Sequence, residues 1–418
     1  MEAERVNKIN VTSEIKPLKK VLLHRPGNEL LNLTPDTLEE LLFDDIPYLP
    51  VAQREHDEFA RVLKENGVEV VYLEKLMSEV LALSEDIREE FLNQFIFEAG
   101  IRTPKYRDLV FQYLNSFKDE YELVLKTMEG IQIYEINRDQ RKDEKSLVDL
   151  VTEETDFLAA PMPNLYFTRD NFASIGRGIS LNKMYSATRN RETIYAEYIF
   201  KYHPDYKGKV DKYYDRCLPY HIEGGDILNL NDHILAVGIS QRTTAEAIDQ
   251  LAKNLFKDEK CKIDTVLAFN IPNSRAFMHL DTVFTQVDRN KFTYHPGIVD
   301  TLQVFEITEG SIADSDEDLN VVEINDTLEN ILSSYLKIPV TLIPCAGGDK
   351  VASEREQWND GSNTLCIAPG VVVVYDRNVI TNEVLRENGL KVIEIPGAEI
   401  SRGRGGPRCM SMPLVRED

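Results

Sequence analysis

The sequence has few cysteines and no closely spaced pair of them. Five occur in 418 residues, without a Cys-x-x-Cys motif, at positions 217, 261, 345, 366 and 409. An odd and dispersed set argues against a disulfide framework and against a cysteine-ligated zinc site. It fits a reducing compartment, so the sequence predicts a cytoplasmic protein.

Long apolar segments are also lacking. No run approaches the roughly 20 apolar residues that a membrane-spanning helix needs. The N-terminal residues do not place a basic stretch before an apolar one, which argues against a signal peptide. We therefore expect no membrane partner.

Positive charge is scarce. Lys and Arg number 48 against 71 Asp and Glu, and the formal net charge is −23. Such a chain repels nucleic acids and anionic membranes, so neither is an expected partner. The same field would concentrate a cationic small molecule, although solubility alone also explains the acidity.

The apolar content is that of a globular protein. Hydrophobic residues make up 42% of the sequence, enough for a sizeable core, and the length allows one large domain or two to three ordinary ones. Apolar runs bounded by turn residues predict strands at 18–25 and 68–73, and helical spacing predicts helices at 51–66, 245–256 and 382–388. Strands alternating with helices indicate an α/β body.

Residues 77–152 have a helical pattern, unlike the strand-rich remainder of the chain. The segment 77–99 has no Gly or Pro and repeats apolar residues every four positions, which predicts one helix ended by Gly100. A second helix is expected after Thr103-Pro104 and a third at 119–129. We predict a helical insertion at 77–152 in a catalytic body made of residues 1–76 and 153–418.

Two further patterns concern the body. Gly-Gly-Asp occurs at 224–226 and again at 347–349, each time followed by apolar residues, which hints at a degenerate repeat of a strand-based module. The acid-rich stretch 306–318 is interpreted as a solvated loop.

Cys409 lies in an unusual local sequence. It ends the run Arg402-Gly-Arg-Gly-Gly-Pro-Arg-Cys409, in which glycines permit close backbone approach and positive φ. Neighbouring positive charge lowers a thiol pKa and favours the nucleophilic thiolate, so we consider Cys409 a candidate for covalent catalysis. A buried structural cysteine is the alternative.

Four other residues supply matching chemistry. His279 and Asp281 share one face if 278–282 is a strand, Glu223 precedes two glycines, and Asp170 closes a Phe-Thr-Arg-Asp run. Cys and His are the usual nucleophile and base for acyl transfer, but several carboxylates around a thiol raise its pKa unless a cation intervenes. A guanidinium substrate would be that cation, because two carboxylates can each accept hydrogen bonds from its planar set of N–H donors.

Simpler interpretations of these residues stay open. Asp170 and Asp281 could be turn or capping residues, and His279 a structural histidine. A metal site formed by His279, Asp281, Glu223 and Asp170 is also conceivable, but a single His is a poor transition-metal set.

The sequence resembles the arginine deiminases over nearly its whole length. The motifs that carry the resemblance are Phe167–Asp170, Glu223–Asp226, Met278–Thr282, Glu354–Trp358 and Arg402–Gly406 leading to Cys409-Met410. The resemblance implies a five-bladed, pseudo-symmetric α/β propeller of strand-based modules with an inserted helical bundle. It also implies a site without a metal or an organic cofactor.

The resemblance assigns roles to ten residues. It implies Cys409 as nucleophile, His279 as acid and base, Asp170 and Asp281 as the guanidinium-binding pair, and Glu223 as the carboxylate supporting both. Positions that hold the amino-acid end of the substrate are Asn164, Arg189, Arg242 and Arg404, with Phe167 packing there. Pro407-Arg408 receives no role.

We therefore expect hydrolysis of L-arginine to L-citrulline and ammonia through a cysteine-bound thiouronium-type intermediate. The alternatives are an amidinotransferase, an agmatine or dimethylarginine hydrolase of the same fold, and a non-catalytic guanidino-binding propeller. A homo-oligomer is expected from the resemblance.

Overall fold

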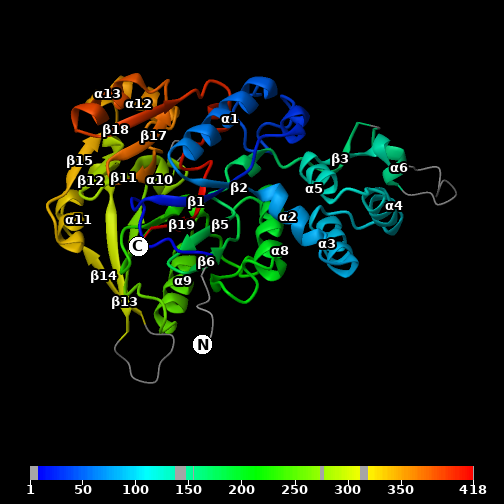
Figure 1. The fold of residues 1–418 in the computed structure, drawn as a ribbon, viewed down its shortest axis with the longest axis horizontal. Helices are drawn as coiled ribbons and strands as arrows, with labels where there is room; N and C mark the ends of the chain where they lie inside the picture. Colours follow the sequence, from blue (N-terminus) through cyan, green and yellow to red (C-terminus); the bar gives the residue numbers. More distant parts are fainter. Residues whose placement is uncertain (1–7, 137–146, 154, 274–276, 311–318, 418) are drawn as a thin grey trace.

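The computed structural model describes residues 8–136, 147–153, 155–273, 277–310 and 319–417, and it has a mixed α/β fold (Figure 1). Among these residues, no helix combines the length and the apolar character needed to span a membrane.

In chain order the strands are β1 (Leu18–Leu23), β2 (Glu69–Tyr72), β3 (Ile131–Gln132), β4 (Phe157–Ala159), β5 (Phe172–Ile175), β6 (Gly178–Leu181), β7 (Asp211–Tyr214), β8 (Ile227–Asn229), β9 (Ile234–Ile239), β10 (Thr265–Asn270), β11 (Phe284–Asp288), β12 (Lys291–Tyr294), β13 (Gln303–Glu309), β14 (Leu319–Ile324), β15 (Thr341–Pro344), β16 (Leu365–Ala368), β17 (Val371–Tyr375), β18 (Lys391–Ile395) and β19 (Met412–Arg416). The α-helices are α1 (Leu49–Glu65), α2 (Leu73–Leu81), α3 (Glu85–Glu98), α4 (Pro104–Asn115), α5 (Glu120–Glu129), α6 (Val148–Val151), α7 (Ala187–Asn190), α8 (Ile194–Tyr202), α9 (Ala245–Lys257), α10 (Leu280–Val283), α11 (Leu328–Leu336), α12 (Lys350–Trp358) and α13 (Val379–Glu387).

Five small sheets share one arrangement. In each, a central strand pairs antiparallel with one neighbour and parallel with the other, in the orders β19-β1-β2, β5-β6-β7, β8-β9-β10, β11-β12-β15 and β16-β17-β18. A parallel pair needs a crossover, and helices α1, α8, α9, α11 and α13 lie in the five crossovers. The third sheet is extended by β13 and β14.

The local sequence explains one such unit. β9 is almost entirely buried, and its run Ile-Leu-Ala-Val-Gly-Ile is the near-continuous apolar pattern of a strand covered on both faces. Helix α9 follows, because Thr244 accepts a hydrogen bond from the N–H of Ala247 and caps its first turn. Its apolar positions, including Ile248 and Leu251, then face the core.

The helices of the proposed insertion lie together on one side of the molecule, where α2 to α6 extend away from the sheets (Figure 1). They are anchored on α8, since Phe91 of α3 packs edge-to-face on Tyr198 at 5.4 Å between ring centroids. The hydroxyls of Thr127 in α5 and Tyr195 in α8 also lie 3.0 Å apart. The division of the chain into body and insertion stays a prediction.

Most expected elements are confirmed, with boundaries shifted by a few residues. β1, β2, α1, α4, α5, α9 and α13 lie where the sequence predicted strands and helices. The single helix expected at 77–99 was wrong, because the chain forms α2 and then α3, with Ser84 capping the second helix. Ser84 accepts a hydrogen bond from the N–H of Ile87, which caps the start of α3. The apolar spacing continues across this point, so spacing alone predicted one unbroken helix.

Three other expectations were wrong in part. Residues 278–282 are not a strand, because the short helix α10 begins directly after His279. Residues 306–309 belong to β13, while 311–318 lie outside the described residues. The two Gly-Gly-Asp segments are not equivalent, since the first leads into β8 and the second into α12.

Candidate active site

A small buried cavity collects most of the residues that the sequence singled out. Its volume is about 20 Å³, which is room for roughly one water. Eight of the ten predicted site residues line it, namely Asn164, Phe167, Asp170, Arg189, Arg242, His279, Arg404 and Cys409. The other two, Glu223 and Asp281, contact His279 and Cys409 respectively.

The five similar sheets explain this convergence. Asp170 precedes β5, Glu223 precedes β8, Asp281 precedes β11 and Cys409 precedes β19. In each sheet this is the strand that pairs antiparallel with the central strand, so the four residues occupy equivalent positions. The fifth such segment, before β16, carries Asn363. Equivalent ends of similar units therefore deliver residues far apart in sequence to one place.

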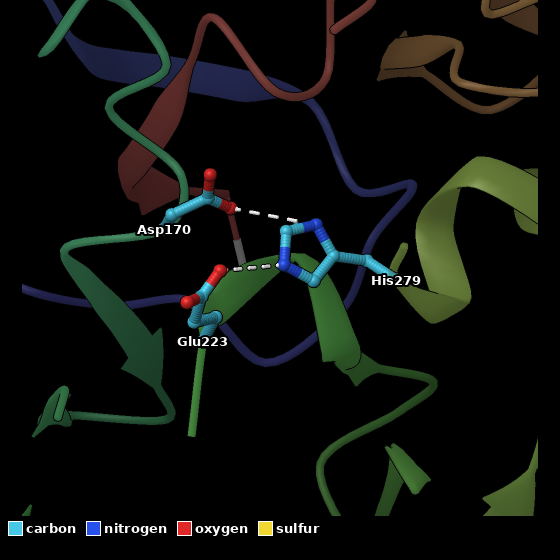
Figure 2. A group of neighbouring side chains, drawn as sticks. All are labelled: Asp170, Glu223 and His279. Atoms are coloured by element: carbon cyan, nitrogen blue, oxygen red, sulfur yellow. Dashed lines mark hydrogen bonds and ion pairs between the residues drawn. The ribbon is translucent and has the colours of Figure 1, made fainter. Parts of the chain in front are cut away.

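His279 lies between two carboxylates (Figure 2). Its Nε2 is 2.8 Å from Glu223 Oε2, and its Nδ1 is 3.8 Å from Asp170 Oδ1. Burial alone would lower the pKa of this imidazole, but Asp170 and Glu223 raise it to about 9. His279 is therefore an imidazolium at neutral pH.

Close backbone approach beside His279 requires glycine. A Cβ added to Gly225 would lie 2.5 Å from His279 Nδ1. The second glycine after Glu223 therefore allows the backbone to lie against the imidazole.

Asp170, Glu223 and His279 also meet the distance condition for a metal site, because one ligand atom of each lies within 4.8 Å of the others. Cations already surround this group. Arg189 and Arg242 lie 4.0 and 3.5 Å from Glu223 Oε2, and a metal would need the neutral imidazole. The donor set suits a charged hydrogen-bonded network better than a transition metal.

The two aspartates predicted to bind a guanidinium share one arrangement. Arg189 donates from Nη1 to Asp170 Oδ2 at 2.9 Å, and Arg408 donates from Nη1 to Asp281 Oδ2 at 2.7 Å. The other oxygen of each carboxylate, Oδ1, is buried and makes no hydrogen bond within the described part of the chain. A buried acceptor without a donor is costly, so each Oδ1 is a ready site for an N–H group.

Cys409 is buried, and its Sγ lies 3.7 Å from Asp281 Oδ2. Burial raises the pKa of the thiol well above its usual range, and Asp281, Asp170 and Asp360 raise it further, whereas Arg408 opposes them. Of the loop arginines, Arg408 favours the thiolate as expected, but burial and the three carboxylates outweigh it, so the expected net lowering of the thiol pKa is wrong.

The positions of the loop arginines explain the difference. Arg402 pairs with Asp45 and Glu399 near the surface, and the Arg404 guanidinium stacks 3.5 Å from the ring centroid of Trp358. Positive φ in this loop belongs to Arg404, at 63°, and not to a glycine. Close approach is confirmed, because a Cβ on Gly405 would lie 2.3 Å from the Phe167 ring.

The predicted carboxylate-reading residues surround the rest of the cavity. Arg242 follows β9 as expected, lies 5.7 Å from the Tyr185 ring centroid and leaves Nε without a hydrogen bond among the described residues. Arg189 is held by Glu192 as well as by Asp170. Asn164 donates to the carbonyl of Leu41 at 2.7 Å.

Three residues near the site had no assigned role from the sequence. Asn363 accepts from the Cys409 N–H at 3.0 Å and donates to the Asp281 carbonyl at 3.1 Å, so it ties the two segments together. Trp358 supports Arg404, and Arg408 holds Asp281. Arg408 carried a signal in its place beside the cysteine and Trp358 in the motif Glu354–Trp358, whereas Asn363 carried none.

Comparison with known proteins decides the family. The family model described as arginine deiminase matches residues 39–416. The chain belongs to the arginine deiminase family. The arginine deiminase of Treponema denticola is 61% identical over 411 residues, covering 98% of this chain and 99% of the relative. That of Clostridium perfringens is 55% identical over 411 residues, covering 98% of each.

More distant solved structures share the fold of this arginine deiminase family member. An amidinotransferase of saxitoxin biosynthesis from Microseira wollei, SxtG, matches with a TM-score of 0.53 at 15% identity, covering 98% of each chain. The N-terminal domain of ArgZ, with a covalently bound reaction intermediate, matches with a TM-score of 0.52 at 13% identity, covering 95% of this chain and 98% of that one.

Proposed function

We propose that this protein hydrolyses L-arginine to L-citrulline and ammonia through a covalent intermediate on Cys409. The observation that carries the proposal is a pair of buried oxygens, Asp170 Oδ1 and Asp281 Oδ1, that accept no hydrogen bond from the described residues and lie beside a buried thiol and a buried imidazolium. Two such acceptors suit the N–H fork of a guanidinium, whose central carbon is the atom to be attacked.

The substrate itself supplies a positive charge that favours the thiolate. Asp170 and Asp281 raise the pKa of the Cys409 thiol, and a bound guanidinium neutralises both of them. The thiol then loses its proton to solvent, because His279 already carries one, and the thiolate forms next to the carbon it attacks. Nucleophile activation is thereby coupled to binding of the correct cation.

His279 serves both halves of the reaction. The Cys409 thiolate attacks the guanidinium carbon, and the His279 imidazolium gives its proton to the departing nitrogen, which leaves as ammonia. The remaining thiouronium-type adduct is attacked by water, whose proton goes to the now neutral His279. The C–S bond then breaks, returning the thiolate and releasing citrulline.

The other predicted residues read the amino-acid end of the substrate. Arg242 lines the cavity and has an unused Nε, so it can pair with an α-carboxylate. Asn164, Phe167, Arg189 and Arg404 line the same cavity. Because the cavity holds only about one water, these side chains must move when arginine enters.

An amidinotransferase is the second candidate, since the distant amidinotransferase SxtG has the same fold. In that reaction an amine replaces the water that attacks the adduct. The high identity to proteins named arginine deiminase over 98% of the chain favours water.

Purified protein incubated with L-arginine should produce citrulline and ammonia in equal amounts. The Cys409→Ser variant is the matched control and should produce neither. Ornithine formed only when glycine is added would support the amidinotransferase, and absence of all three products would refute the proposal.

We also propose that the five sheets are the blades of a propeller around the cavity. Their shared strand order supports this arrangement. Location in the cytoplasm, self-association and the absence of a nucleic-acid partner remain predictions of the sequence.

A further inference from the structure

Arg408 points inward from the residue next to the nucleophile. Its side chain is 1% exposed, and its guanidinium uses all three nitrogens. Nη1 donates to Asp281 Oδ2 at 2.7 Å, Nε donates to Glu14 Oε2 at 3.1 Å, and Nη2 donates to the carbonyl of Ile227 at 2.8 Å. A planar fork held at three points has one orientation.

Glu14 fixes this arrangement from the other side. Its Oε1 accepts from the N–H of Asn229 at 3.1 Å, and its own N–H donates to the Asn229 carbonyl at 2.7 Å. Burial alone would raise the pKa of Glu14, but Arg408 and Arg169 bring it down to about 2. Glu14 is therefore ionised at neutral pH, where it pairs with Arg408.

The contact with Asp281 determines which carboxylate oxygen stays available. Arg408 occupies Oδ2, and Oδ1 is left as a buried acceptor without a hydrogen bond among the described residues. Arg189 does the same for Asp170, but Arg189 also lines the cavity, whereas Arg408 does not. Arg408 therefore acts on the site only through Asp281 and Cys409.

We propose that Arg408 is a positioning residue of the reaction: anchored by Glu14, it keeps Asp281 turned so that Oδ1 receives the substrate guanidinium, and its charge offsets the carboxylates around Cys409. This inference rests on the proposed function of Asp281 and Cys409. A merely structural arginine would neutralise Glu14 and change stability without changing substrate affinity or pH dependence.

The test compares Arg408→Lys with Arg416→Lys. Lysine keeps the charge but cannot reach Asp281, Glu14 and the Ile227 carbonyl together. Arg416 is equally buried and donates to the carbonyls of Lys16 and Cys366 at 2.5 and 2.9 Å, without a hydrogen bond to Asp281. It is therefore the matched control for loss of a buried guanidinium.

The readouts are kcat, KM and the pH dependence of kcat/KM for arginine, with thermal unfolding measured in parallel. Supporting residues of this kind typically contribute about 10- to 100-fold to activity. Arg408→Lys should lose that much in kcat/KM, mainly through KM, and its acidic limb should move to higher pH. Arg416→Lys should lower the unfolding temperature while leaving KM and the acidic limb in place.

Three outcomes separate the possibilities. If the wild type forms no citrulline, the proposed function fails. If the wild type is active and Arg408→Lys changes KM and the pH profile no more than Arg416→Lys does, only the role of Arg408 fails. Should Arg408→Lys not fold, the double variant Glu14→Gln/Arg408→Met removes both charges of the pair. Its KM and pH profile are then compared with those of Arg416→Lys in the same way.

Discussion

We expect the charge on Glu223 to control the pH range over which His279 acts as an acid. Glu223 is completely buried, accepts from His279 Nε2 at 2.8 Å and accepts from the Tyr185 N–H at 3.0 Å. The isosteric variant Glu223→Gln keeps the shape and removes the charge. We expect His279 to lose part of the stabilisation of its imidazolium form.

The size of the effect follows from this hydrogen bond. A hydrogen bond to a charged group is worth about 1.5–3 kcal/mol, which corresponds to roughly one to two pKa units. The pKa of His279, now about 9, should fall to between roughly 7 and 8. The imidazolium fraction at pH 9 then drops about 5- to 50-fold, but less than about twofold at pH 6.5.

The assay is the pH profile of kcat/KM for arginine from pH 6 to 10. The alkaline limb should move to lower pH in Glu223→Gln. Glu192→Gln is the matched control, because Glu192 is also buried and binds Arg189 but makes no hydrogen bond to His279. It should raise KM without moving the limb. An alkaline limb that stays in place in Glu223→Gln would refute the assignment of His279 as the acid held charged by Glu223.

Three further predictions concern other parts of the molecule. Cys409→Ser should retain arginine binding and lose turnover, and intact-mass analysis of wild-type enzyme quenched during turnover should show an adduct on the Cys409 peptide; full activity of the variant would contradict covalent catalysis. Arg242→Ala should cost ~2–5 kcal/mol in kcat/KM for arginine and far less for agmatine, which lacks the carboxylate, so equal losses would show that Arg242 does not read it. Burial alone would lower the pKa of His24, but Glu74 and Glu29 raise it to about 10, above the usual 6.5, so its stabilisation is complete below pH 6.5 and is lost as pH rises toward 10. Urea unfolding should show stability falling by up to ~1.4 kcal/mol per pH unit across that window in wild type but not in His24→Gln, and parallel slopes would count against this reasoning.

Local sequence predicted most of the secondary structure and the residues of the candidate site. Apolar periodicity and capping residues locate α4, α5 and α9, because these signals act within a few residues of each other. The prediction from local sequence was wrong at α10. There, Asp226 Oδ1 accepts a hydrogen bond from the N–H of Leu280, which lies 54 residues later in the chain, and this bond helps to hold the turn. A contact at that distance leaves no mark in the local pattern.

The electrostatic state of the site depended on tertiary structure. The arginines that precede Cys409 predicted a thiolate, but Arg404 is turned toward Trp358 and Asp281 is brought to the thiol from 128 residues away. Burial and the packing of distant carboxylates raise the pKa of that thiol, and neither is encoded in the spacing of neighbouring residues. The sequence thus predicted which groups form the candidate site, while the fold decided the burial of the thiol, the carboxylate oxygens that accept no hydrogen bond among the described residues, and the contact of Arg408 with Asp281.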